Sequence, residues 1–136
     1  MISFNYETDF KLQKEDQISK WISSVISAEH FNEGEINYIF CDDEYLLKLN
    51  MEFLNHDTLT DIISFDYTMG KQINGDIYIS VERVNENADD FKVDFNSELS
   101  RVMVHGVLHY CGYKDKSEPE EAEMRSKENY YIAQLS

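Results

Sequence analysis

One segment in the last third of the chain is apolar on almost every side, and it sets the strongest limit on the fold. Its apolar residues are Leu99, Val102, Met103, Val104, Val107, Leu108, Tyr110 and Cys111. Asn96 or Ser97 can cap the start of a helix over this segment, and Gly112 can end it in the left-handed conformation. A helix without a broad polar face must be buried on most sides. We therefore predict a central helix around which the other elements pack.

The other segments alternate between strand and helix patterns. β-branched and aromatic residues indicate strands at residues 1–6, 36–40, 61–67 and 73–80. Apolar residues at helical spacing indicate helices at residues 12–29, after Asp42, at 81–91 and at 118–134. The helix after Asp42 is expected to bury Leu46, Leu49 and Phe53, and Ser117 and Glu120 form a capping box for the last helix. The expected fold is α/β or α+β, with about four strands in one sheet packed against helices.

Length and composition place the chain in a broad class. Its 136 residues fit one domain, so residues 1–136 are expected to form a single unit. No apolar run approaches the roughly 20 residues of a membrane helix, and the first residues have no basic cap followed by an apolar stretch. Cys41 and Cys111 are too few for a disulfide framework. We expect a protein without membrane attachment in the reducing cytoplasm.

The charge balance limits the possible partners. The net charge is −15, and the 12 lysines and arginines are scattered without a dense block. Broad binding to phosphate backbones needs clustered basic residues. Charge alone therefore points away from nucleic acid, and DNA is not an expected partner.

Two histidines interrupt the apolar segment at helical spacing. His105 and His109 lie four residues apart, so a helix places both imidazoles on one side, where they can bind one ion. Such pairs also occur by chance, but two unpartnered imidazoles on a buried helix would be costly to desolvate. Gly112 reverses the chain, so Asp115 can return toward the pair. Two histidines and a carboxylate form an open site of the kind that binds catalytic zinc.

Three sequence blocks resemble the signatures of one family. HGVLHYCGY at residues 105–113 is similar to the H-G-x-L-H-x-x-G-Y-D-H signature of the YbeY family of bacterial rRNA maturation factors and metal-dependent endoribonucleases. DTLTDIISF at residues 57–65 resembles that family's K-D-x-P-T-D-V-L-S-F segment. GDIYIS at residues 75–80 resembles its G-D-I-x-I-S strand, and the three blocks follow in the family's order.

The resemblance implies a zincin-like domain whose central buried helix carries the metal histidines. It implies one Zn²⁺ ion per chain, or another divalent metal, bound by His105, His109 and Asp115. The implied activity is cleavage of single-stranded RNA in the maturation of the 16S rRNA 3′ end and in ribosome quality control. The implied partners are rRNA, the small ribosomal subunit and its assembly factors, while the oligomeric state stays open.

The chain departs from the family pattern at the site itself. Asp115 stands where the family has its third histidine, and an anionic ligand weakens the Lewis acidity of the ion. Leu54 and His56 stand where the family has an arginine and a lysine. Arg83 is a candidate replacement cation, and the alternative for it is a solvated charge on a helix.

These observations leave three functional hypotheses. The first is a zinc-dependent endoribonuclease, with Ser64, Arg83 and His56 as candidate substrate-binding residues and with no general base identified. The second is a ribosome-assembly factor that binds without cutting and contains a structural metal. The third is a metallopeptidase, which is disfavoured because Gly106 occupies the place of the usual catalytic glutamate.

Overall fold

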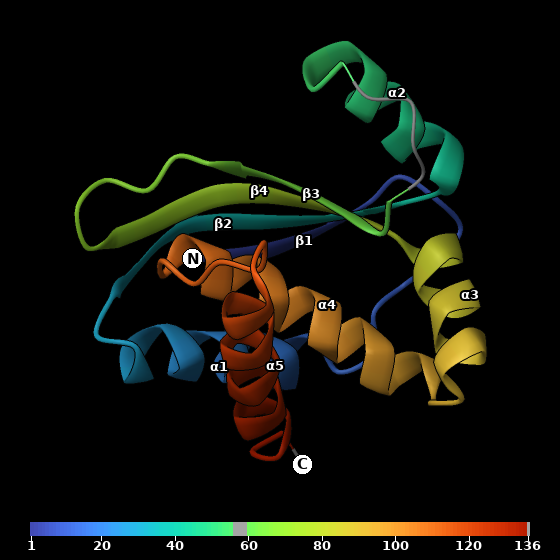
Figure 1. The fold of residues 1–136 in the computed structure, drawn as a ribbon. Coiled ribbons are helices and arrows are strands. Elements are labelled where there is room, and N and C mark those ends of the chain that lie inside the picture. The colour runs from blue at the N-terminus through green and yellow to red at the C-terminus, as the bar shows by residue number, and fades with distance from the viewer. Residues whose placement is uncertain (56–59, 136) are drawn as a thin grey trace.

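The computed structural model describes residues 1–55 and 60–135. Within them the elements, in chain order, are β1 (Ile2–Tyr6), α1 (Glu15–Ala28), β2 (Asn32–Cys41), α2 (Asp43–Phe53), β3 (Ile62–Asp66), β4 (Gln72–Ser80), α3 (Val81–Phe91), α4 (Phe95–Tyr110) and α5 (Glu118–Ile132). Figure 1 shows a four-stranded sheet with helices packed on it. The α+β fold expected from the sequence is confirmed.

The sheet is mixed and has the strand order β1-β2-β4-β3. β1, β2 and β4 run parallel, and β3 pairs antiparallel with β4 at one edge. A tight turn joins β3 to β4, with Gly70 in the left-handed conformation at φ 59°. The sheet therefore places the start of β3 beside the end of β4.

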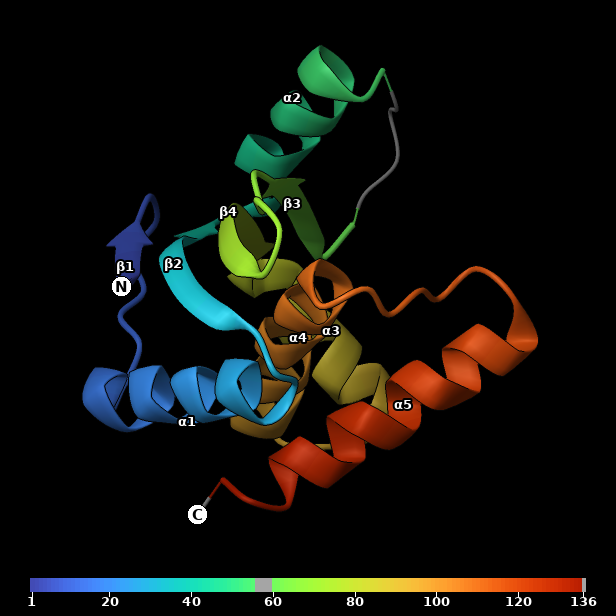
Figure 2. The same cartoon turned by 90° about the vertical axis from the view of Figure 1, so that its left-hand side faces the viewer.

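The helices cover the two faces of the sheet unequally. α1 and α4 pack on one face and α5 packs against α4, whereas α2 lies on the opposite face (Figures 1 and 2). The main core lies between the sheet and α1 and α4, and a smaller cluster of Cys41, Leu46 and Ile63 lies under α2. α4 is buried along most of its length, as its apolar sequence predicts.

Gly106 lies on the side of α4 that packs against the sheet. A Cβ atom at this position would lie 3.1 Å from Cδ1 of Ile77 and 3.2 Å from Cδ1 of Ile62. The space for a side chain is therefore tight. A glutamate of the peptidase type would fit at this position only if the side chains of Ile77 and Ile62 moved by at least a few tenths of an ångström.

Several predicted helix ends are confirmed and two details are wrong. The Ser117–Glu120 capping box is present, and Gly112 has φ 101°. α4 begins earlier than expected, at Phe95, because the backbone is already helical there and Asp94 before it has the extended conformation of an N-cap residue; Ser97 lies within the first turn and donates to the Asp94 carboxylate. Phe53 is 61% exposed, because α2 is alone on its face and nothing else covers the outer side of this residue among the described residues.

Candidate metal centre

The two histidines and the aspartate meet at the C-terminal end of α4. Nε2 of His105 and Nε2 of His109 lie 3.0 Å apart. Oδ2 of Asp115 lies 3.2 Å from each of these nitrogens. The prediction that the three side chains converge is therefore confirmed.

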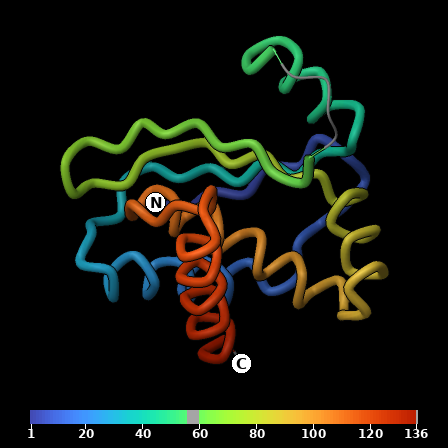
Figure 3. The backbone as a smooth tube through the Cα atoms, viewed as in Figure 1, coloured from blue at the N-terminus to red at the C-terminus, as the bar shows by residue number. Residues whose placement is uncertain are grey.

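The end of α4 explains how Asp115 reaches the histidines. The N–H of Gly112 donates to the carbonyl of His109 at 3.0 Å, and the N–H of Tyr113 donates to the carbonyl of Leu108 at 3.1 Å. This is the Schellman arrangement, in which a residue with positive φ turns the chain back across the last helical turn. The following loop then leads from the end of α4 into α5, which crosses α4 and packs against it (Figure 3).

The Nδ1 atom of each imidazole, which faces away from the other two side chains of the site, is hydrogen-bonded to an oxygen. Nδ1 of His105 lies 2.6 Å from Oε2 of Glu128, and Nδ1 of His109 lies 2.9 Å from the carbonyl oxygen of Tyr113. A carboxylate and a carbonyl only accept, so each imidazole donates from Nδ1. In the neutral rings both Nε2 atoms then present lone pairs to each other and to Asp115. Three electron-pair donors that face one another are stabilised by a positive charge between them, either a proton on one imidazole or a metal ion.

The spacing of these atoms fits one metal ion. Zinc binds imidazole nitrogen and carboxylate oxygen at about 2.0–2.2 Å in tetrahedral geometry, which separates two ligand atoms by about 3.4 Å. The observed separations are 3.0–3.2 Å. A few tenths of an ångström of outward movement would bring all three atoms to ligand distance, and two of the three residues, His105 and Asp115, also line the adjoining cavity.

The charges around His105 favour its cationic form while no metal is bound. Burial by itself lowers the pKa of His105, but the hydrogen bond and charge of Glu128, together with Asp115 and Asp61, raise it above its ordinary value. Burial likewise raises the pKa of Glu128, but His105 and Arg101 outweigh this and lower it. The environment thus stabilises positive charge on the imidazole, and a metal ion at Nε2 supplies such a charge.

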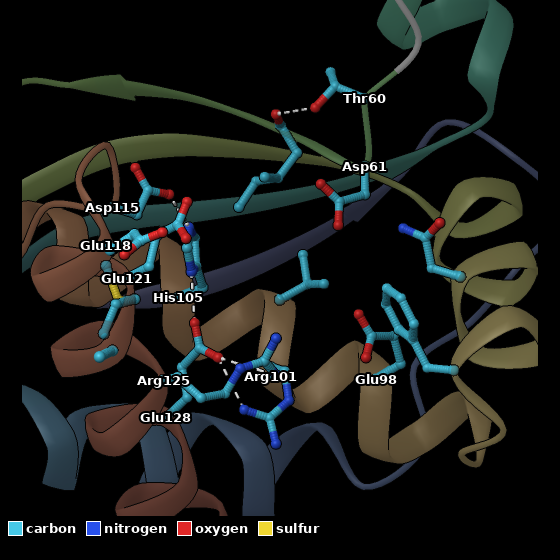
Figure 4. A pocket seen from close by; sticks show the side chains of 16 residues that line it. Thr60, Asp61, Glu98, Arg101, His105, Asp115, Glu118, Glu121, Arg125 and Glu128 are labelled. Carbon is cyan, nitrogen blue, oxygen red and sulfur yellow. Dashed lines mark hydrogen bonds and ion pairs between the residues drawn. The ribbon is translucent and has the colours of Figure 1, made fainter.

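A cavity of about 830 Å³ opens beside the site. Its charged lining residues come from the segment before β3, from α4, from the loop after α4 and from α5, and they are Asp61, Glu98, Arg101, Asp115, Glu118, Glu121, Arg125 and Glu128 (Figure 4). Burial is the main reason why the pKa values of Asp61 and Glu98 are raised. The cavity is therefore rich in carboxylates and has arginines on one side.

The predicted substrate-binding residues lie elsewhere or outside the described residues. Arg83 pairs with Asp43 at 2.8 Å and with Glu86 at 2.6 Å, and Ser64 is exposed on β3. Among the described residues, neither lines the cavity beside the site. His56 falls within residues 56–59, which the structure does not describe.

Several residues of the site were missed at the level of sequence. Glu98, Arg101, His105 and His109 follow the spacing i, i+3, i+7, i+11, so they form one polar stripe on an otherwise apolar helix. That stripe is a signal that identifies Arg101 and Glu98. Glu128 gives no such signal, because it reaches His105 from another helix.

Comparisons with known proteins give one consistent result. Residues 2–136 match the family model described as YbeY: Endoribonuclease YbeY. A protein of Flavobacterium psychrophilum named Endoribonuclease YbeY is 68% identical, and the match covers 95% of this chain and 92% of the relative. A protein of the same name in Christiangramia forsetii is 54% identical, and the match covers 97% of this chain and 92% of the relative. The solution structure of TM1509 from Thermotoga maritima is similar with a TM-score of 0.71 and 25% identity, covering 99% of this chain and 89% of that one.

Proposed function

The chain belongs to the YbeY family, whose curated relatives are named endoribonucleases, and we propose that it hydrolyses RNA in a metal-dependent reaction. The observation that carries the metal dependence is the convergence of His105, His109 and Asp115 on one point at the edge of a large cavity. Residues 1–136 would act together as one hydrolase domain.

We propose Zn²⁺ as the metal, with one ion per chain and other divalent ions as substitutes. Two imidazoles and one carboxylate form the usual open set of a catalytic zinc site. A bound ion supplies a Lewis acid that polarises a phosphodiester oxygen. Asp115 adds a negative charge to the ligand set, so we expect weaker Lewis acidity than three neutral imidazoles would give.

The arginines of the cavity are the proposed phosphate contacts. Arg125 lines the cavity, its side chain is 60% exposed, and its closest carboxylate oxygen, on Glu128, lies 3.8 Å away. Its donors are therefore available to an RNA phosphate beside the metal ligands. The charge of Arg83 is committed to Asp43 and Glu86, so Arg125 fits this role better.

We propose that the substrate is single-stranded rRNA at the 3′ end of the 16S species, with a further role in ribosome quality control. The small ribosomal subunit and its assembly factors would then be the partners, and the cytoplasm the location. In the described part of the chain, no helix combines the length and hydrophobicity needed to cross a membrane.

Metal content and nuclease activity together test the proposal. We expect purified protein to hold close to one equivalent of zinc or another divalent metal, and His105→Ala to lose both the metal and RNA cleavage. Less than about a tenth of an equivalent in undepleted wild-type protein would contradict the metal site. RNA cleavage that persists in His105→Ala after chelation would contradict the metal-dependent reaction.

The carboxylates of the cavity favour a second function, in which the protein binds a ribosomal partner without cutting. The net charge is −15, and Asp61, Glu98, Glu118 and Glu121 face the same cavity as the arginines. These charges repel phosphate. If His109→Ala restores 16S rRNA processing in cells that lack the protein, this second function is correct and the nuclease proposal fails.

A further inference from the structure

Glu128 is the most deeply buried carboxylate beside the proposed metal site. It lies on α5 and is 4% exposed. Its Oε2 accepts from Nδ1 of His105 at 2.6 Å, and its Oε1 accepts from NH1 of Arg101 at 2.9 Å. Each oxygen therefore has a different partner, and the plane of the carboxylate is set by both.

Arg101 holds this carboxylate from a fixed position. It lies four residues before His105 on α4, so the two side chains project from the same side of the helix. Its NH2 also donates to Oδ1 of Asn129 at 2.8 Å, next to Glu128 on α5. The guanidinium thus contacts two consecutive residues of α5, and Figure 4 shows it beside Glu128 and below His105.

Stability alone does not account for this arrangement. The buried carboxylate and the half-buried guanidinium both lose hydration, and replacing a buried ion pair with apolar side chains is often neutral or stabilising. The imidazole, however, has two nitrogens, and a metal needs one of them free of its proton. An acceptor at Nδ1 holds the proton there and leaves the Nε2 lone pair directed at His109 and Asp115.

We propose that Glu128, held by Arg101, is a positioning residue that fixes the tautomer and ring orientation of His105 for metal binding. The carboxylate also makes the imidazole a stronger electron donor, because negative charge at Nδ1–H increases electron density at Nε2. The inference rests on the proposed metal site. It adds that α5, although it supplies no ligand, completes the site.

Zinc affinity measures this role directly. We compare wild type, Glu128→Gln and Glu128→Met by Zn²⁺ titration in competition with a chromophoric chelator. Glu128→Met has no acceptor for Nδ1–H, and we expect its Kd for Zn²⁺ to rise about 10- to 100-fold. Glu128→Gln keeps a neutral acceptor, so a smaller rise is expected.

Glu29→Gln is the matched control. Glu29 is also a largely buried carboxylate that accepts hydrogen bonds from α5, but none of its contacts in the described part of the chain is with a histidine. We expect it to lower stability without changing the Kd for Zn²⁺. This control separates loss of α5 packing from loss of the His105 hydrogen bond.

The position of the proton on the His105 imidazole can be measured directly, and a change in helix packing alone would not alter it. Long-range ¹H–¹⁵N spectra of the metal-free proteins, recorded above the pKa of His105, assign its tautomer. We expect the Nδ1–H form in wild type and in Glu128→Gln, and a mixture with the Nε2–H form in Glu128→Met.

The outcomes are distinguishable from failure of the metal site itself. If wild type does not bind Zn²⁺, the proposed function fails. If wild type binds and both Glu128 variants bind with a Kd within about twofold of it, or if Glu29→Gln weakens binding as much as Glu128→Met, the positioning role is wrong. Should Glu128→Met not fold, Glu128→Gln decides through its Kd.

Discussion

Two carboxylates link α5 to the rest of the molecule, the buried Glu128 and the largely buried Glu29, and they do so with different partners. Glu128 binds His105 and Arg101 of α4. Glu29, whose side chain is 11% exposed, accepts from the hydroxyls of Tyr113 and Tyr131 and pairs with Lys127 at 3.4 Å. The two are thus alike in charge and burial, and their partners differ.

The partners determine what each carboxylate can do. Burial and Glu29 raise the pKa values of Tyr113 and Tyr131, so both phenols keep their protons at neutral pH. At neutral pH the protonation of the Glu29 cluster is therefore fixed, and we assign it a structural role. Glu128 is bound to an imidazole whose second nitrogen points at two other ligand atoms. The difference lies in the partner: His105 has a second nitrogen that can bind a metal ion, whereas the hydroxyls of Tyr113 and Tyr131 have no further atom of this kind.

The largest expected effect is the gain in stability when Zn²⁺ binds, and it should depend on Glu128 but not on Glu29. Zn²⁺ that binds only the folded protein should add about 4 kcal/mol to the free energy of unfolding at 1,000 times its Kd. We expect this increment in wild type and Glu29→Gln, a smaller one in Glu128→Gln, and none in His109→Ala. Chemical denaturation with and without Zn²⁺ measures this increment. An increment in His109→Ala equal to that of wild type would show that His109 is not a ligand of the metal.

The next largest effect is the loss of stability expected when the positive charge of Arg101 loses its partner Glu128. Glu128→Ala leaves the guanidinium of Arg101, which is 23% exposed, without its buried partner. We expect a loss of about 3 kcal/mol in the free energy of unfolding of the metal-free protein. The double variant with Arg101→Met should recover part of the loss in a double-mutant cycle. Additive losses would show that the pair is not coupled.

Glu29→Gln should have a smaller effect, with a defined pH dependence. Burial alone would raise the pKa of Glu29, but hydrogen bonds from Tyr131 and Tyr113 and the charge of Lys127 lower it below its ordinary value of 4.5. A lowered folded pKa contributes stability above the unfolded pKa, and this contribution is lost as pH falls through the folded pKa.

The stability difference between wild type and Glu29→Gln follows from this sign. It should be about 1.5–2 kcal/mol at pH 7 and should shrink below the ordinary carboxyl pKa of 4.5. Urea unfolding across this range measures it. A difference that grows as pH falls would mean that the carboxylate is not stabilised by its partners.

The smallest expected effect tests whether the two clusters are independent. Tyr113 belongs to both, because its carbonyl accepts from His109 and its hydroxyl donates to Glu29 at 2.7 Å. Tyr113→Phe removes only the hydroxyl, so we expect a loss of about 1 kcal/mol in stability and an unchanged Kd for Zn²⁺. A weaker affinity in this variant would show that the Glu29 cluster also supports the metal site.

Much of the ligand set was predictable because it depends on local geometry. The four-residue spacing of His105 and His109 sets their shared helix face, and Gly112 provides the left-handed turn that returns Asp115. Arg83 was a reasonable candidate by position along the chain. Its actual partner, Asp43, lies on a different helix, and only the packing of that helix against α3 brings the two charges together.

The sequence by itself determined the central helix and the pair of histidines that we propose as metal ligands, because both depend on residue spacing within a few helical turns. It also carried the resemblance to a family, which rests on short sequence blocks. Tertiary structure alone decided that Glu128 reaches His105 across 23 positions of the chain and that Arg101 holds it there. The physical reason is that the orientation of an imidazole depends on what packs against it in space. No spacing within α4 contains that information.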